Sequence, residues 1–153
     1  MPKLDLSTIA LRTGSGYPAP FDAICAGRSR QALGDAGGLT QFGVNLLQLA
    51  PGTASSQRHW HTHEDEFVFV VAGTVVLVTD DGEQVLHAGD CAAFPAGVPD
   101  GHQIINRGSE PAVCLEVGSR IPGDGARYPD IDLIYDGSTE SYTHRDGTPY
   151  PKR

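Results

Sequence analysis

The sequence has little of several features that would assign it to a familiar class of protein. Its three cysteines, Cys25, Cys91 and Cys114, are odd in number, widely spaced and contain no CxxC pair. This pattern argues against a disulfide framework and favours reduced, buried thiols. The amino-terminal stretch MPKLDLSTIA has no apolar run long enough for a signal peptide or a membrane-spanning helix. We therefore expect a cytoplasmic protein with no membrane partner.

Positive charge is also scarce. The chain has 11 Lys and Arg residues against 19 Asp and Glu residues, which gives a formal net charge of -8. Nucleic acids and anionic membranes present dense phosphate charge, so we expect neither as a partner. The expected partner is a small molecule.

No convincing long helix is predicted, and short apolar runs are frequent. The 153 residues fit one domain, in which 19 Gly and 11 Pro separate runs rich in Val, Phe and Ile. Short strands at this spacing predict an antiparallel sandwich or barrel. Strands are predicted from Thr40 to the Pro51-Gly52 turn and over 66–71, 74–79, 83–87, 91–94, 102–106 and 112–117, with a hairpin turn at Asp80-Asp81-Gly82.

The predicted barrel covers residues 40–120 and has an irregular arm at each end. Residues 1–39 form an N-terminal arm that packs on the barrel, with a short helical turn around Ser29–Leu33 before Gly37-Gly38. Residues 121–153 form a C-terminal arm, which is either a partly ordered tail or a segment that packs over the barrel or a partner subunit. The second interpretation depends on the IDLIY run and on four scattered tyrosines: Tyr128, Tyr135, Tyr142 and Tyr150.

Half of the six histidines lie within five residues, at His59, His61 and His63, and Glu66 follows them. Alternate residues of an extended strand share a face, so His59 and His61 can direct two imidazoles at one point. Imidazoles with a nearby carboxylate suit Zn, Fe, Ni or Mn. The stretch predicts a mononuclear site for one divalent transition metal.

Glu66 comes five residues after His61. Because five is an odd number, one uninterrupted strand cannot put both side chains on the same face. A turn over residues 62–65 would bring His59, His61 and Glu66 together and leave His63 near the site rather than in it. The alternative ligand set is His61, His63 and Glu66. Catalytic residues stay open, with Glu66 and His63 as candidates. Proton-transfer chemistry at such a metal would also need a general base, and His63, Glu64 and Asp65 lie near the predicted rim of the site.

A fourth ligand is expected from a distant segment, and His102 is the best candidate. It follows a loop that contains Pro95 and Gly97, and it shares one strand face with Ile104 and Asn106. His87 and His144 have no such neighbours and are interpreted as structural.

Two motifs resemble those of the cupin superfamily. The first has the form G-x5-HxH-x4-E-x6-G, and four residues match its spacing, while Gly52 lies one residue further upstream than expected. The matching residues are His59, His61, Glu66 and Gly73.

The second motif has the form G-x5-PxG-x2-H-x3-N. His102 comes two positions later than the pattern, as expected for a two-residue insertion, and Asp100 stands where the pattern has its histidine. The residues that resemble this motif are Gly89, Pro95, Gly97, His102 and Asn106.

The resemblance implies an all-β, antiparallel jelly-roll barrel that holds one metal inside, through three His and one Glu. The implied ligands are His59, His61, Glu66 and His102, with Asp100 as the substitute for His102. Small single-domain members are often described as sugar-phosphate or mannose-6-phosphate isomerase-like, which implies an enzyme that acts on a small oxygen-rich molecule chelated by the metal. The alternatives are a cupin dioxygenase or decarboxylase, or a non-catalytic small-molecule-binding or sensor module.

The phosphate part of that description has little support near the motifs. No glycine-rich loop opens a helix, and the nearest cations are Arg58 and Arg107. Arg58 adjoins His59 and should point away from the site if the segment is extended.

The strand that begins at Glu66 is apolar on both faces. If Glu66 points into the barrel, Val68 and Val70 follow it, which leaves a second apolar set outside. That outer set needs cover from the flank of the second sheet, from the terminal arms or from a second subunit, and we predict a homodimer. The outer set consists of Phe67, Phe69 and Val71.

Overall fold

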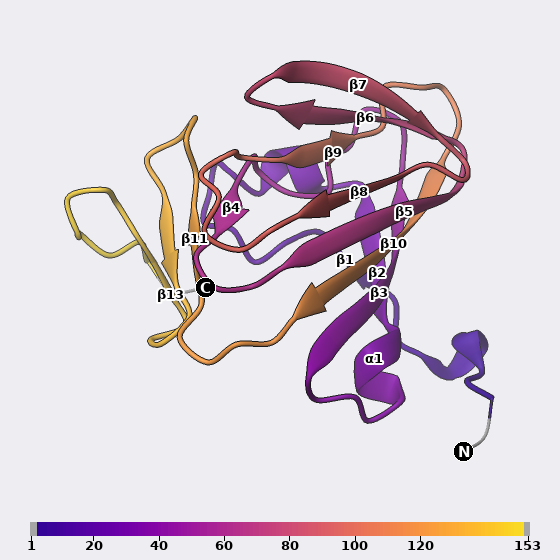
Figure 1. The fold of residues 1–153 in the computed structure, drawn as a ribbon, viewed down its shortest axis with the longest axis horizontal. Coiled ribbons are helices and arrows are strands. Elements are labelled where there is room, and N and C mark those ends of the chain that lie inside the picture. The colour runs from indigo at the N-terminus through magenta and orange to yellow at the C-terminus, as the bar shows by residue number, and fades with distance from the viewer. Residues whose placement is uncertain (1–2, 152–153) are drawn as a thin grey trace.

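The computed structural model describes residues 3–151, which form short strands with one short helix (Figure 1). None of the described helices is long and apolar enough to span a membrane. In chain order the elements are β1 (Arg12–Thr13), β2 (Arg28–Ala32), α1 (Leu33–Ala36), β3 (Phe42–Leu49), β4 (Trp60–His61), β5 (Glu66–Ala72), β6 (Thr74–Thr79), β7 (Gly82–His87), β8 (Cys91–Phe94), β9 (Gln103–Ile105), β10 (Ala112–Ser119), β11 (Gly125–Arg127), β12 (Ile134–Asp136) and β13 (Ser141–Thr143), with 3-10 turns at Leu6–Thr8 and Ala23–Cys25.

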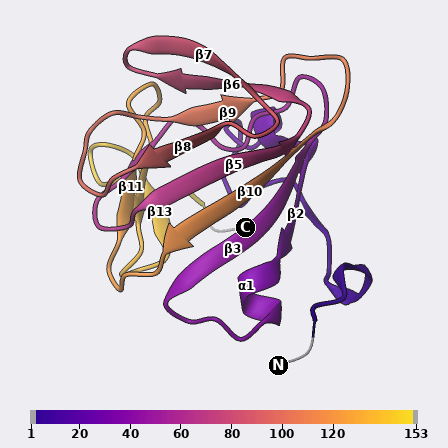
Figure 2. The same ribbon diagram turned by 45° about the vertical axis from the view of Figure 1, so that its right-hand side comes forward.

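The strands form three antiparallel sheets. A six-stranded sheet has the order β1-β2-β3-β10-β5-β8, and a three-stranded sheet has the order β7-β6-β9. The third sheet has four strands in the order β13-β12-β11-β4. Figure 2 shows β8, β5, β10 and β3 side by side in the larger sheet. Strand β10 lies between β3 and β5, which are far earlier in the chain, as in a jelly roll. The predicted all-β antiparallel jelly-roll fold is confirmed.

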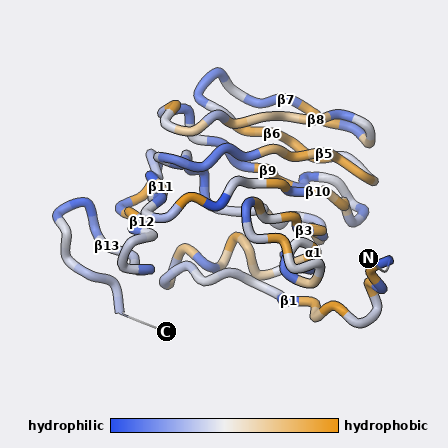
Figure 3. The backbone as a smooth tube through the Cα atoms, turned by 60° about the horizontal axis from the view of Figure 1, so that its bottom comes forward, coloured by the Kyte–Doolittle hydropathy of each residue, from blue (hydrophilic) through white to orange (hydrophobic). Residues whose placement is uncertain are grey.

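The six-stranded and three-stranded sheets enclose one apolar core. Strand alternation directs every second residue of β3, β5 and β10 toward the β6-β7-β9 sheet. Hydrophobic residues recur along these strands, whereas the region near β13 is hydrophilic (Figure 3). The core residues are Leu47, Leu49, Val68, Val70, Val75, Leu77, Leu86, Ile104, Ala112 and Cys114.

Gly73 makes the tight connection between β5 and β6. Its φ is +81°, and a Cβ added there would lie 3.0 Å from the Ala112 Cα and from the Pro111 carbonyl oxygen. Because both the left-handed backbone and the close approach disfavour a side chain, glycine is required at this position.

The helical turn predicted around Ser29–Leu33 is wrong over its first four residues. Arg28–Ala32 is strand β2, and the short helix α1 begins only at Leu33. Strand β2 pairs antiparallel with β3 along its whole length, and this long-range pairing outweighs the local helical tendency.

The described part of the C-terminal segment packs on the barrel. Strand β11 pairs with β4, so it continues from the strand that carries His61. A second apolar cluster joins this segment to the N-terminal one through Tyr17, Tyr128 and Leu133, all buried. The interpretation as a packed arm is therefore the better one.

Of the three thiols, Cys25 and Cys114 are buried as expected, but Cys91 is exposed. Cys91 pairs with Phe69 across β8 and β5, and this row of residues faces outward. The prediction of a buried Cys91 is wrong because alternation on β8 directs its neighbours, Ala92 and Phe94, toward the core instead.

The outer face of β5 is apolar, as predicted. Phe67, Phe69 and Val71 remain 38%, 37% and 47% exposed, while Val68 and Val70 are buried. Neither arm covers these three side chains, so a homodimer stays a prediction.

We expect sedimentation equilibrium at micromolar concentration to give a dimer, and expect Phe67→Ser with Phe69→Ser to give a monomer, because the double change removes apolar surface. Val85→Ser is the matched control, since Val85 is 58% exposed on β7 of the other sheet. A wild-type monomer, or a dimer that survives the double change, would contradict the prediction.

Candidate metal centre

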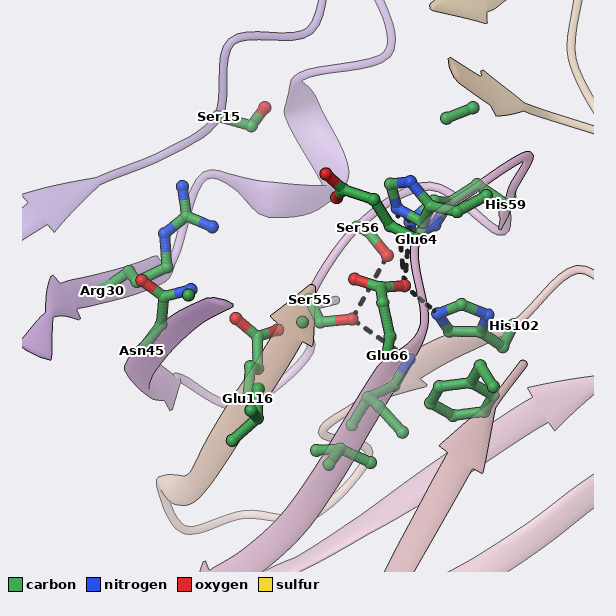
Figure 4. Close-up of a pocket in the computed structure, with 18 of the residues that line it drawn as sticks. Ser15, Arg30, Asn45, Ser55, Ser56, His59, Glu64, Glu66, His102 and Glu116 are labelled. Carbon is green, nitrogen blue, oxygen red and sulfur yellow. Dashed lines mark hydrogen bonds and ion pairs between the residues drawn. The ribbon is translucent and has the colours of Figure 1, made fainter. Parts of the chain in front are cut away.

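The structure brings the four predicted metal ligands to one place inside the jelly roll, and Figure 4 shows three of them, His59, Glu66 and His102. The Nε2 atoms of His59 and His61 lie 3.1 Å apart. Glu66 Oε2 lies 3.6 Å from the first of these nitrogens, 3.5 Å from the second and 2.8 Å from His102 Nε2. The ligand atoms of His59, His61 and Glu66 all fall within 4.8 Å of one another, and His102 joins them through Glu66.

The predicted turn between His61 and Glu66 is confirmed. Strand β4 ends at His61 and β5 begins at Glu66, so the odd step is taken up outside the strands. The turn is fixed by Asp124, whose Oδ1 accepts hydrogen bonds from the backbone N–H groups of His63 and Glu64, at 2.8 and 3.2 Å.

A reciprocal pair of backbone hydrogen bonds connects the two motif segments. The His59 N–H donates to the His102 carbonyl at 3.1 Å, and the His102 N–H donates to the His59 carbonyl at 2.8 Å. This isolated antiparallel bridge places the two side chains next to each other, with ring centroids 4.8 Å apart. The fourth predicted ligand therefore comes from a distant loop, as expected.

Neighbouring groups fix the orientation of each ring. Nδ1 of His59 lies 2.9 Å from the Gln57 carbonyl oxygen, and Nδ1 of His61 lies 2.5 Å from Asp124 Oδ2. Both partners are acceptors, so each Nδ1 carries a proton when it bonds to them and each Nε2 presents a lone pair. The His102 ring stacks on Phe94, with centroids 3.6 Å apart.

The other predicted candidates have different hydrogen-bond partners from those of this cluster. Asp100 Oδ1 accepts a hydrogen bond from the Asp80 N–H at 2.8 Å, so His102 rather than Asp100 meets Glu66. His63 hydrogen-bonds to Thr62 and lines a separate groove beside β12, which does not favour the ligand set that includes it. His87 and His144 contact Thr74 and Asp132 respectively, far along other elements.

Burial and charge set the protonation of the cluster. Burial lowers the pKa of His59 to about 4, and the nearby Glu66 carboxylate offsets only part of that effect. Burial also opposes the charged form of His61, but Glu66 and Asp124 outweigh it and raise its pKa. Burial disfavours an ionised Glu66, yet the three histidines hold its pKa at about 2. At neutral pH the site therefore has an anionic Glu66 and a neutral His59, the forms that bind a metal.

The donor set fits a divalent metal. Two lone pairs that face each other at 3.1 Å repel unless a cation or a proton lies between them. Ligand atoms about 2.1 Å from one ion are about 3.0 to 3.4 Å apart for octahedral to tetrahedral angles, close to the spacings found among these nitrogens and the carboxylate. Glu66 Oε2 and His102 Nδ1 are also buried without a hydrogen bond among the described residues. Oε2 is thus free to accept a cation.

A cavity of about 470 Å³ opens beside the cluster and is lined by both ends of the chain as well as by the barrel strands. Of the three predicted rim residues, only Glu64 lines it. Glu64 Oε1 accepts a hydrogen bond from the Ile121 N–H, and burial raises the pKa of its carboxyl.

Glu116 is the site residue that the sequence analysis missed. It lies on β10 opposite Asn45 of β3 and Val68 of β5, and its side chain enters the cavity (Figure 4). Burial raises the pKa of Glu116 to about 7, although Arg30 and Arg28 favour its ionised form. The sequence pattern could have identified Glu116, because it is a single Glu at an inward position of an otherwise apolar strand, after Ala112 and Cys114.

Comparison with known proteins agrees with this fold and site. A family model described as the cupin domain matches residues 45–118. One solved structure with a similar fold is a sugar phosphate isomerase of the cupin superfamily from Silicibacter pomeroyi. Its sequence is 53% identical to this one, and the two structures match with a TM-score of 0.93 over 98% of this chain and 97% of that chain. A candidate sugar phosphate isomerase from Acidithiobacillus ferrooxidans is 30% identical, with a TM-score of 0.73, over 82% of this chain and 81% of that one.

More distant structures share the fold alone. The polyketide cyclase RemF from Streptomyces resistomycificus is 17% identical, with a TM-score of 0.68 over 90% of both chains. No curated protein matches the sequence. The extent and identity of the nearer matches show that the chain belongs to the cupin superfamily.

Replacement of Asp124 by Asn should weaken metal binding about 10- to 100-fold, because His61 loses the acceptor that orients its ring. The measurement is competition for Zn²⁺ with a chromophoric chelator. Asp132→Asn is a matched control, because Asp132 holds the Nδ1 of the remote His144 at 2.7 Å in the same way. Equal loss in the two variants would contradict the assignment.

Glu116→Gln should stabilise the metal-free protein increasingly as the pH rises from about 5 to 8. With a folded pKa of about 7 and an ordinary value near 4.5, the folded state holds this proton longer than the unfolded state, so ionisation destabilises the wild type. Below the ordinary value both states are protonated and the difference disappears. Melting temperatures of the two proteins in chelator, taken across this range, measure the effect, and a constant difference would contradict it.

Proposed function

We propose that the chain binds one divalent transition metal through His59, His61, Glu66 and His102 and acts on a small oxygen-rich molecule as a sugar or sugar-phosphate isomerase-like enzyme. The observation that carries the proposal is the pair of Nε2 atoms that face each other at 3.1 Å while their Nδ1 atoms contact acceptors. Such a pair, next to a buried carboxylate, has the donor atoms and the spacing that bind a divalent cation.

An ion at this site would polarise the carbonyl oxygen of a bound hydroxy-ketone or hydroxy-aldehyde. The chain's own residues position the ligands of such an ion and leave space beside it. Asp124 orients His61, the Phe94 ring fixes His102, and the cavity provides room for a small substrate.

Isomerisation also needs a group that takes a proton from one carbon and returns it to the next. Glu116 has the position and the acidity for this role, because it enters the same cavity and makes no hydrogen bond with residues 3–151. Its pKa of about 7 lies near neutral pH, where a carboxylate exchanges protons most effectively.

The relatives support this class of reaction. The Silicibacter pomeroyi protein, which the chain matches over nearly its whole length, is a sugar phosphate isomerase. A shared fold alone carries little information about chemistry, so the proposal depends on the site as well.

The test is proton exchange and aldose–ketose conversion of hexoses, pentoses and their phosphates, followed by NMR in D2O, on protein whose metal content is measured without added metal. Glu66→Gln should lose the metal and all turnover. Glu116→Gln should keep the metal and lose turnover on the order of 10²- to 10⁴-fold. His87→Ala, on β7 away from the cavity, is the control and should retain both.

Other outcomes identify the alternatives. Oxygen consumption or release of CO2 from a chelating substrate would replace the isomerase proposal by a dioxygenase or a decarboxylase. Ligand binding without turnover by the metal-loaded protein would leave a binding or sensor module. A metal content unchanged by Glu66→Gln would contradict the ligand set itself.

A further inference from the structure

Two arginines lie directly opposite each other on neighbouring strands. Arg12 of β1 pairs in register with Arg30 of β2, and both line the cavity that contains the metal cluster. Like charges in this arrangement repel and destabilise a sheet. Neither guanidinium has a hydrogen bond or an ion pair among residues 3–151, so no close carboxylate partner within the described chain offsets the repulsion.

The remaining described arginines differ from this pair. Each donates to a carboxylate or a backbone carbonyl; Arg28, for example, donates to the Gly14 carbonyl at 2.8 Å and to the Ser55 carbonyl. These hydrogen bonds tie each of these guanidinium groups to a partner in the protein. The residues are Arg28, Arg58, Arg107, Arg120, Arg127 and Arg145.

The cations near the motifs do not supply an anion site. Arg58 pairs with Asp130 and Asp80, and so points away from the cluster as predicted, while Arg107 pairs with Glu83. The cavity takes its positive charge instead from the N-terminal strands, which the sequence analysis treated as an arm.

The arginine pair and the metal cluster lie at different sides of one cavity. Figure 4 shows Arg30 beside Asn45 and Glu116 on one side, with Glu66 and His102 on the other. Strand β2 is three strands from β5 in the sheet, about 14 Å at about 4.8 Å per strand, and the long arginine side chain reduces this gap. A molecule of several bonds can therefore span it.

Glu116 does not neutralise the pair. Its carboxyl forms no ion pair with either arginine, and burial raises its pKa even though Arg30 acts in the opposite direction. Within residues 3–151, both arginines of the cavity wall are therefore without a salt bridge.

We propose that Arg12 and Arg30 form an anion subsite that holds the carboxylate or phosphate group of a substrate whose oxygens reach the metal cluster. Guanidinium groups bind both anions through paired N–H donors. The identity of the whole substrate depends on the function proposed above, but binding of a free anion at the pair does not.

The first experiment uses metal-free protein and inorganic phosphate, with calorimetric titration as the readout. The wild type should bind phosphate with an affinity that falls as salt is added. Arg30→Gln should weaken binding at least tenfold, and Arg30→Lys should weaken it less, because it keeps the charge. Arg107→Gln is the matched control, since Arg107 is exposed and pairs with Glu83 outside the cavity.

The second experiment uses Zn²⁺-loaded protein with glucose, glucose 6-phosphate and gluconate. Both anions should bind at least tenfold more tightly than glucose, and this preference should disappear in Arg30→Gln. The tighter of the two identifies the anion as phosphate ester or carboxylate. If Arg30→Gln does not fold, as judged by circular dichroism, Arg12→Gln on the exposed edge strand replaces it in both experiments.

Equal phosphate affinity in the wild type and the arginine variant, or no preference for anions over glucose, would overturn the subsite. A different set of results would show that the proposed function is wrong while the subsite is right. In that case the metal-free protein still binds phosphate through Arg30, while the metal content or the turnover fails its own test.

Discussion

The candidate metal centre depends on two backbone hydrogen bonds, those that join His59 and His102 in both directions. The two segments are far apart in the chain and neither is a long strand at this point, since β4 ends at His61 and β9 begins at Gln103. Without the bridge, nothing in the local sequence would align the two imidazoles. With it, the jelly roll supplies the two remaining candidate ligands: His61 at the end of β4 and Glu66 as the first residue of β5.

One sheet face serves both stability and chemistry. Along β5 the inward residues change from Val70 and Val68, in the apolar core, to Glu66 in the site, and along β10 they change from Cys114 to Glu116. Burial of a charged group costs free energy unless another group compensates it. The histidines compensate Glu66, whereas Glu116 has no such partner and becomes more basic instead. The apolar core residues of β5 and β10 therefore support the part of the same strands that carries Glu66 and Glu116.

The sequence was sufficient for features that depend on periodicity. The parity of the step from His61 to Glu66 predicted the turn, and the alternation after Glu66 predicted which residues face outward, including Phe67. It was insufficient for Asp124 and Arg30, which reach the site only through pairing of β11 with β4 and of β2 with β3. Such contacts join residues distant in sequence, and a short strand within a polar segment has no periodic pattern that would reveal it.

The same long-range pairing explains why one fold can support many reactions. The motif residues fix the ligand atoms, but the wall facing them is built by β1 and β2, which lie outside the segment that matches the cupin family model. A change of side chain at Arg12 or Arg30 would alter the charge of that wall without disturbing the ladder between β3 and β10. The proposed anion subsite can therefore vary independently of the proposed metal ligands, because Arg12 and Arg30 lie on β1 and β2, whereas His61 and Glu66 lie on β4 and β5.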